Sequence, residues 1–170
     1  ERPRARGGLR AIAGFDFQLR SYLADFVEGL VAEDDISAAG DQFAAQLEAF
    51  SDWVQASPNT LVCVQAKRTL RADSLSAAAL EFAVLDRYFE AARGGDFAAS
   101  VEYEVCSRQS EIGVPGPERW SKVRLPSATP ERDALQARFD ELVESGRVGV
   151  RLDPDPEWRL VAKTLPILSD

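Results

Sequence analysis

The fold of this chain is decided by the stretch LVCVQAK, residues 61–67. An apolar beginning followed by a polar end predicts a strand that enters the core. Since the side chains of a strand alternate between its two faces, we expect Gln65 and Lys67 to share one face with Cys63. The opposite face would carry Val62, Val64 and Ala66. An amide and an ammonium group would then lie side by side at the end of a core strand.

A carboxylate lies close upstream, at Asp52 in the stretch LEAFSDWV, residues 47–54. Residues 42–55 are predicted to form a strand and Ser57-Pro58-Asn59 a turn, so the two strands would make an antiparallel hairpin. A helix over 42–55 stays an open alternative, because Ala, Gln and Glu favour helices. In the hairpin the carboxylate would converge with Gln65 and Lys67. Such a set can hold a divalent metal and stabilise negative charge on a phosphate.

The rest of the chain alternates helix and strand patterns. Apolar residues recur at helical spacing in two segments, which predicts amphipathic helices there. The expected stripes are Tyr22, Leu23, Phe26, Val27, Leu30 and Val31 in the first, and Leu75, Ala79, Leu80, Ala83, Val84 and Tyr88 in the second. The predicted elements are an Arg- and Gly-rich segment at 1–14, a helix over 15–32, strands at 42–55 and 61–68, a helix over 75–93 capped by Asp73-Ser74, a strand at 97–106, a loop over 107–127, a helix from Thr129 to Gly146, and a last strand pair at 148–152 and 158–162.

The composition and this order of elements predict one soluble α/β domain. The chain has 170 residues, of which 45% are hydrophobic and 28% charged, which is enough to build a core. It begins at Glu1 and contains no methionine, so we expect residues 1–170 to be a single domain from the N-terminal part of a larger, multidomain protein. No apolar run approaches the roughly 20 residues that span a bilayer. The sequence shows no secretory signal pattern, and we expect a cytoplasmic protein.

The chain contains no histidine, which excludes whole classes of active site. Ser-His-Asp hydrolases, Cys-His proteases, histidine-ligated zinc sites and histidine-based nucleases all need that side chain. The two cysteines, Cys63 and Cys106, lie in predicted strands and are expected to be buried, reduced thiols. Carboxylates acting with a hard metal are the simplest hydrolytic machinery that remains.

The net charge of −8 argues against strong nucleic-acid affinity by this domain alone. Positive residues are nevertheless clustered, and a bound metal would cancel site carboxylates locally. The N-terminal cluster is either a DNA contact or a flexible tail. The clustered cations are Arg2, Arg4, Arg6 and Arg10 near the start, and Lys67, Arg68 and Arg71 at and beyond the end of the decisive stretch.

Several short motifs together resemble one family. They are Gly7-Gly8, Gly14-Phe15-Asp16-Phe17-Gln18, Glu48 with Ser51-Asp52, and Val64-Gln65-Ala66-Lys67. Over residues 1–110 the chain resembles the restriction-endonuclease-like PD-(D/E)xK superfamily, and within it the nuclease domains of bacterial anti-phage defence effectors. The resemblance implies a restriction-endonuclease-like core with a mixed central β-sheet flanked by α-helices. Those effectors join this domain to a nucleotide-sensing or NTPase module.

The resemblance also implies roles for individual residues. Asp52 would be the metal-binding carboxylate, and Gln65, where many members carry Glu, would offer its carbonyl oxygen to the same Mg²⁺ or Mn²⁺ ion. Lys67 would orient the attacking water and stabilise the charge on the phosphorane. Gln65 lacks the negative charge of Glu, and Ser51 stands where the motif has proline. Further implied residues are Glu48 or Glu28 as another acidic group, the Ala66 carbonyl as a metal ligand, and Gln18, Arg10, Arg68 and Arg71 as DNA contacts.

The resemblance thus implies a Mg²⁺-dependent endodeoxyribonuclease that cuts double-stranded DNA as the effector domain of an anti-phage defence system. Cutting both strands usually needs two sites, so we expect a homo-oligomer controlled by a sensor domain of the same polypeptide. Two alternatives stay open: a catalytically inactive module for assembly or DNA docking, and an RNA or nucleotide phosphodiesterase. Structural roles are alternatives for single residues, with Gln65 and Lys67 on the solvent face of an edge strand and Glu28 as a structural residue beside the helix stripe. The tryptophans Trp53, Trp120 and Trp158 are expected in the core or at its rim.

Overall fold

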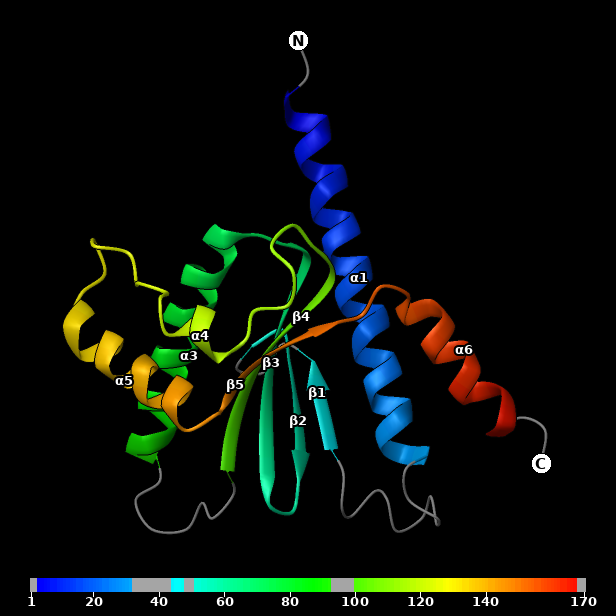
Figure 1. The fold of residues 1–170 in the computed structure, drawn as a ribbon. Helices are drawn as coiled ribbons and strands as arrows, with labels where there is room; N and C mark the ends of the chain where they lie inside the picture. Colours follow the sequence, from blue (N-terminus) through cyan, green and yellow to red (C-terminus); the bar gives the residue numbers. More distant parts are fainter. Residues whose placement is uncertain (1–2, 32–43, 48–50, 93–99, 168–170) are drawn as a thin grey trace.

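The computed structural model describes residues 3–31, 44–47, 51–92 and 100–167, and within them the side chains of 13–31, 51–92 and 100–165. Helices and strands alternate along the chain (Figure 1). The elements in chain order are α1 (Pro3–Val31), β1 (Ala44–Leu47), β2 (Trp53–Ser57), β3 (Thr60–Leu70), α3 (Ala72–Ala92), β4 (Ser100–Ser110), α4 (Pro117–Trp120), α5 (Arg132–Glu144), β5 (Val148–Leu152) and α6 (Pro156–Ile167).

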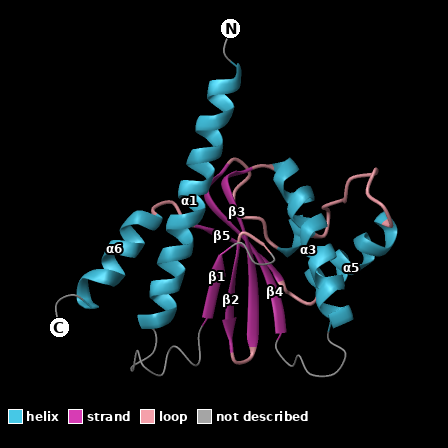
Figure 2. Cartoon of the chain, turned by 180° about the vertical axis from the view of Figure 1, so that it is seen from behind, coloured by secondary structure: helices cyan, strands magenta, loops and turns pink. Residues whose placement is uncertain are grey.

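The strands form one mixed sheet in the order β1-β2-β3-β4-β5. Strands β1, β2 and β3 pair antiparallel, whereas β3, β4 and β5 pair parallel. Helix α1 covers one face of the sheet and α6 packs beside α1, whereas α3, α4 and α5 lie on the other face (Figure 1, Figure 2). The prediction of an α/β fold with a mixed central sheet flanked by helices is therefore confirmed.

Strand β3 lies at the centre of the sheet, and its side chains alternate as predicted. Cys63 packs into the larger core, between the sheet and α3. Val64 packs on the opposite face, in the cluster that contains Phe17 of α1. Beyond Val64 strand β3 pairs only with β4, but Gln65 is buried against α3, so the alternative that Gln65 and Lys67 form the solvent face of an edge strand is wrong.

Strands β2 and β3 form the predicted antiparallel hairpin. The single strand predicted over 42–55 is wrong, because β1 and β2 are separate strands that pair antiparallel with Leu47 opposite Trp53. The helical alternative is wrong for the described part of that segment as well. The chain bends at Ser51 and Asp52, where the Ser51 hydroxyl donates to the carbonyl oxygen of Trp53 at 2.8 Å. Such local side-chain bonds compete with strand pairing, which explains the break.

The C-terminal segment differs most from the prediction. Strand β5 pairs parallel with β4 and not in a hairpin with the segment that follows it. Residues 158–162, predicted as a strand, lie in α6. Asp155 caps this helix, since its Oδ1 accepts the backbone N–H of Trp158 at 3.1 Å, and the residue after Asp155 is a proline that fits the first turn. Trp158 is largely exposed, whereas Trp53 and Trp120 lie in the core.

Helix α1 begins at Pro3 and not near residue 15, so it includes most of the Arg- and Gly-rich segment that was predicted to precede the helix. Proline fits the first turn of a helix, and the Arg, Ala and Leu residues that follow favour a helix enough to offset the glycines. The N-terminal part of α1 projects beyond the sheet (Figure 1). The buried face of α1 carries Phe17, Ser21 and Ala24, so the predicted apolar stripe flanks that face instead of forming it.

Helix α3 matches its predicted range, and Leu75, Ala79, Leu80 and Ala83 of its predicted stripe pack into the core, but the stripe is wrong at its other two positions. Phe82 and Phe89 are buried, while Val84 and Tyr88 of the stripe are exposed. Burial of two phenylalanines removes more apolar area from water than burial of a valine and a tyrosine, whose hydroxyl prefers water. The packed face is therefore the one that carries the larger purely apolar side chains.

Two boundaries after α3 also differ from the prediction. Strand β4 continues to Ser110, and α4 lies inside the segment predicted as a loop over 107–127. Helix α5 begins at Arg132 and not at Thr129. The residue before the helix, Glu131, has a left-handed backbone with φ of 54°, which a right-handed helix cannot include.

Candidate functional site

Asp52 is held from two sides at the bend before β2. Its Oδ2 accepts a hydrogen bond from the backbone N–H of Ala66 at 2.5 Å, which ties the carboxylate to β3. The Gln18 side chain donates from Nε2 to the backbone carbonyl oxygen of Asp52 at 3.3 Å, which ties the bend to α1. Hydrogen bonds to a charged acceptor are short and strong, so the hairpin fixes the Asp52 carboxylate beside the polar end of β3.

Gln65 points from β3 towards α3 and is only 7% exposed. Its Nε2 donates to a carboxylate oxygen of Glu81 on α3. Its carbonyl oxygen, Oε1, is buried and has no hydrogen-bond partner among the described residues. Because the large majority of buried polar atoms are partnered, this oxygen is available to accept a hydrogen bond or to ligate a cation.

Glu81 brings the charges of the site together. Burial and then the neighbouring Asp52 carboxylate raise the pKa of Glu81, and the Lys67 ammonium partly offsets this. These three groups are thus close enough for their charges to act on one another. We name Asp52, Gln65, Lys67 and Glu81 the polar cluster. It lies between the β2–β3 hairpin and α3, and it contains the three residues predicted to act together.

Glu81 is the member of the cluster that sequence reasoning missed. It lies between Ala78 and Leu85 in the series of α3 positions that faces the sheet, and both of these neighbours pack into the core. A carboxylate on an otherwise apolar inward face needs a partner inside the protein, since burial of an unpaired charge is costly. The place of Glu81 on the apolar face of α3 is therefore the sequence signal that could have identified it as a member of the cluster.

The remaining predicted site residues lie apart from the cluster or outside the described structure. Glu48 lies outside the described residues, and of Arg10 only the place in the backbone of α1 is described. Gln18 is nearly buried, and its bond to the Asp52 backbone gives it a positioning role. Arg68 and Arg71 line a separate pocket that adjoins the end of β3. Their DNA contacts stay predictions.

A second group of charges lies behind Trp53, on the α1 side of the sheet, and sequence reasoning did not foresee it. Asp25 of α1 accepts from Nε1 of Trp53 at 3.2 Å and from Nη2 of Arg151 at 2.7 Å, and it pairs with Arg159 of α6 at 2.8 Å. Glu28 pairs with Arg159 at 2.7 Å, which places it here and not in the polar cluster. We name this group the ionic network; its further members are Glu104 and Asp153.

The polar cluster supplies the oxygen donors that Mg²⁺ prefers. Two are the carboxylates of Asp52 and Glu81, and the third is the partnerless Oε1 of Gln65. Among the described residues, His, Cys, Asp and Glu side chains do not gather in threes or more as a ready-made metal site. The donor set therefore fits an ion held by few protein ligands together with water, as is usual for Mg²⁺. The Ala66 carbonyl stays a predicted ligand.

Comparison with family models, with curated proteins and with solved structures gives no match to this chain. Within the described residues, every helix is too short or too polar to cross a membrane. The polar cluster and the motif resemblance are thus the basis on which a function can be assigned.

Proposed function

We propose that this chain is a Mg²⁺-dependent nuclease with a restriction-endonuclease-like core, which hydrolyses phosphodiester bonds of double-stranded DNA. The observation that carries the proposal is Oε1 of Gln65, a buried carbonyl oxygen without a hydrogen-bond partner among the described residues. It belongs to a cluster that also holds two carboxylates and an ammonium group. A cluster with a purely structural role would be expected to pair its buried polar atoms within the protein.

The charge of the cluster supports dependence on a cation. Asp52 and Glu81 carry two negative charges when ionised, against the one positive charge of Lys67. A phosphodiester approaching this set would be repelled. The raised pKa of Glu81 has the same electrostatic origin in part, since the Asp52 carboxylate opposes its ionisation. A divalent cation would reverse the sign of the local charge and admit the substrate.

Each residue of the cluster has a separate task in this proposal. Asp52 and Gln65 would hold the ion, and Glu81 would supply the negative charge that Gln65 lacks relative to Glu. Magnesium, when bound, neutralises charge on the phosphate and lowers the pKa of a bound water. Lys67 keeps an ammonium group beside the phosphate and stabilises the negative charge that develops on its oxygens. Glu81, with its raised pKa, would accept a proton from the attacking water.

The biological setting of the proposal rests on the motif resemblance. We assign the chain to the cytoplasm as the effector domain of a prokaryotic anti-phage defence system, under the control of a sensor domain of the same polypeptide. The net charge of −8 makes DNA binding by one copy weak. A homo-oligomer would offer two sites for the two strands and would raise the apparent affinity through multivalency.

A second function, an inactive module for assembly or DNA docking, has its own support. Gln65 and Glu81 already satisfy each other in part through their mutual hydrogen bond. Among the described residues, three or more acidic side chains are nowhere placed so that they could hold a metal ion together. Metal binding that depends on Asp52 separates the two functions, because a docking module has no need of it.

The test is cleavage of supercoiled plasmid by the full-length protein with Mg²⁺ or Mn²⁺. We expect Asp52→Asn and Lys67→Ala each to lower the rate at least about 100-fold, the scale of losing one electrostatic contact in a transition state. Glu118 and Lys122 form an ion pair that, unlike the polar cluster, is exposed: their side chains are 88% and 72% exposed. Glu118→Gln and Lys122→Ala are therefore the matched controls and should leave the rate unchanged.

The results of this cleavage assay distinguish the nuclease from the docking module and DNA from RNA as the substrate. Cleavage that both cluster substitutions abolish, and that EDTA stops, supports the nuclease and its site together. Mg²⁺ binding and cleavage both absent from the activated full-length protein would leave the docking module. Cleavage that survives both substitutions would place the site elsewhere, and preference for an RNA substrate would correct the substrate class.

A further inference from the structure

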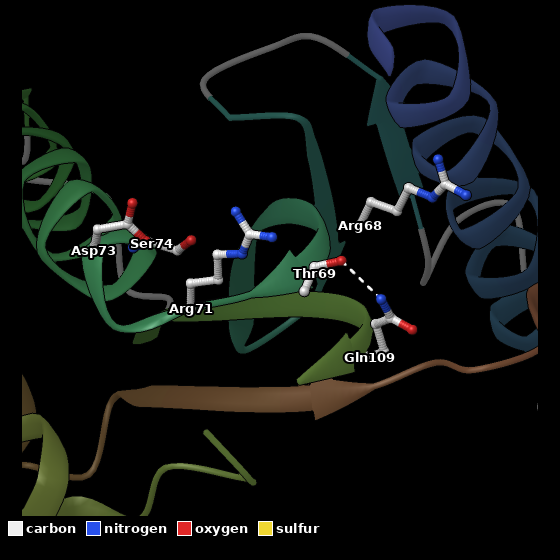
Figure 3. A pocket seen from close by; sticks show the side chains of 6 residues that line it. All are labelled: Arg68, Thr69, Arg71, Asp73, Ser74 and Gln109. Atoms are coloured by element: carbon white, nitrogen blue, oxygen red, sulfur yellow. Dashed lines mark hydrogen bonds between the residues drawn. The ribbon is translucent and has the colours of Figure 1, made fainter. Parts of the chain in front are cut away.

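A polar pocket of about 500 Å³ lies where β3 and β4 end and α3 begins (Figure 3). This size falls in the range of about 300–1,000 Å³ typical of small-ligand sites. No step of the proposed reaction uses it. The side chains that line it are two guanidinium groups, two hydroxyls, an amide and a carboxylate, from Arg68, Thr69, Arg71, Asp73, Ser74 and Gln109.

We propose that this pocket binds a backbone phosphate of the nucleic-acid strand, next to the phosphodiester that the polar cluster would cut. The inference rests on the proposed function and deepens it. The polar cluster carries more negative than positive side chains, so it supplies little affinity for a polyanion by itself. A neighbouring phosphate contact would supply that affinity and set the position of the strand.

The two arginines flank the pocket and are available to a ligand. Arg68 and Arg71 lie on opposite sides of Thr69 in Figure 3. Within the described part of the chain, Arg68 forms no hydrogen bond or ion pair. Arg71 pairs with Glu111 at 3.1 Å, but the two side chains are 60% and 56% exposed. Such an exposed pair contributes about 0–1 kcal/mol, so a phosphate can replace the Glu111 carboxylate at little cost.

The floor of the pocket is fixed in a way that leaves a donor for the ligand. Gln109 donates from Nε2 to Oγ1 of Thr69 at 3.0 Å, across the β3–β4 pair (Figure 3). Because the Thr69 hydroxyl accepts this bond, its own proton is left to donate elsewhere. A phosphate offers only acceptors, so it complements this hydroxyl as well as the arginines.

The sum of charges in the pocket also favours an anion. Among the described residues that line it, Asp73 is the only acidic one, against the two arginines. The Oδ1 of Asp73 accepts the backbone N–H of Ser74 at 2.9 Å, so part of its charge is engaged by the start of α3. In a chain of net charge −8, a pocket with a positive balance stands out as a place for a phosphate.

The pocket follows the polar cluster along the same strand. Lys67 and Thr69 are alternate residues of β3, with Ser107 and Gln109 opposite them on β4. Alternate residues of a strand share one face and lie about 7 Å apart. This separation is comparable with that between successive phosphates of a nucleic-acid strand. The carboxyl ends of parallel strands are also the usual edge for ligand binding in α/β sheets.

The test is fluorescence anisotropy with a labelled DNA duplex, with Ca²⁺ in place of Mg²⁺ so that the duplex stays intact. The full-length protein is compared with its Arg68→Ala/Arg71→Ala variant. We expect affinity to fall about tenfold, and the slope of log affinity against log salt to shrink by about 2, one per lost phosphate contact. The control is Arg87→Ala. Arg87 pairs with Glu131, and the two side chains are 57% and 60% exposed, much as in the pair of Arg71 with Glu111. The control substitution should leave both quantities unchanged.

An affinity and a salt slope that stay unchanged in the double variant, with its thermal unfolding also unchanged, would overturn the inference even if the protein cuts DNA. Loss of duplex binding in the double variant, with binding retained in Arg87→Ala, would support the pocket even in a protein that cuts nothing. Inorganic phosphate and a mononucleotide serve as competitors. If either binds more tightly than the duplex, and does so through Arg68 and Arg71, the pocket holds a small phosphate compound and the strand assignment is overturned.

Discussion

Replacing Asp25 with asparagine should destabilise the protein, because Asp25 is the acceptor that the ionic network shares. Its side chain is 5% exposed, and it receives Arg151 at 2.7 Å and Arg159 at 2.8 Å. It also accepts from the indole of Trp53 at 3.2 Å. Asparagine keeps the size of the side chain and one acceptor oxygen. The substitution therefore removes chiefly the charge that both arginines face.

The magnitude follows from burial. Removal of one partner of a buried ion pair costs about 3–5 kcal/mol. The side chains of Arg151 and Arg159 are 29% and 23% exposed, and each has another carboxylate within reach, Glu104 and Glu28 respectively. Water and these carboxylates recover part of the loss, so we expect the free energy of unfolding to fall by about 2–3 kcal/mol. In a chain of 170 residues this lowers Tm by about 4–12 °C.

Urea and thermal unfolding, followed by circular dichroism, measure this loss. The control is Glu118→Gln, which removes the same kind of charge from the exposed pair with Lys122 and should cost less than about 0.5 kcal/mol. A loss in Asp25→Asn no larger than in this control would show that water, and not the carboxylate, compensates the two arginines. The ionic network would then have no part in holding α1 and α6 to the sheet.

Two further predictions concern groups whose pKa the fold raises. Burial above all raises the pKa of Glu81, so its ionised form costs stability, and this cost appears as the pH rises above the pKa of the unfolded chain. Glu81→Gln should therefore raise the free energy of unfolding at about pH 8 but not at about pH 3.5, measured by urea titration; an equal effect at both pH values would contradict the cause. Burial also raises the pKa of Cys63 and Cys106, each to about 12, so a disulfide reagent should modify neither thiol of the native protein quickly at about pH 8. Rapid modification without urea would show that the strands open.

The core of the fold was predictable where the signal is local. The alternation of Cys63, Gln65 and Lys67 against Val64 follows from the geometry of a single strand, and the structure confirms it. The hairpin turn before β3 is equally local. For the same reason the convergence of Asp52 with the end of β3 could be predicted, since the hairpin brings the two together.

The rest of the site depends on tertiary contacts that one sequence does not reveal. Glu81 meets Gln65 only because α3, which lies between the parallel strands β3 and β4 in the chain, packs across β3. The ionic network joins Asp25 near the start of the chain to Arg159 near its end. Periodicity locates helices and strands, but it does not tell which charged side chains of distant elements will meet.

Two misread segments show how local signals compete. The sequence of residues 158–162 mixes aromatic, branched and polar side chains in a strand-like manner, but the cap at Asp155 and the proline after it decide for a helix. At the other end, the helix was predicted to begin only at residue 15, whereas Pro3 and the residues around the glycines support a helix from there on. In both cases the start signal of the helix carried more information than the residues inside it.

The two faces of the sheet combine apolar and ionic contacts in different proportions, and temperature acts on these two kinds of contact in opposite ways. On the α3 face, side chains such as Phe82 and Phe139 form a hydrocarbon core. On the α1 face, Arg151 and Arg159 bind a set of carboxylates. Apolar attraction weakens on cooling, whereas the cost of drying an ion pair falls on warming. Cooling therefore destabilises the packing on the α3 face more than that on the α1 face, and warming lowers the desolvation cost of the ion pairs on the α1 face. The two faces need not lose their packing at the same temperature.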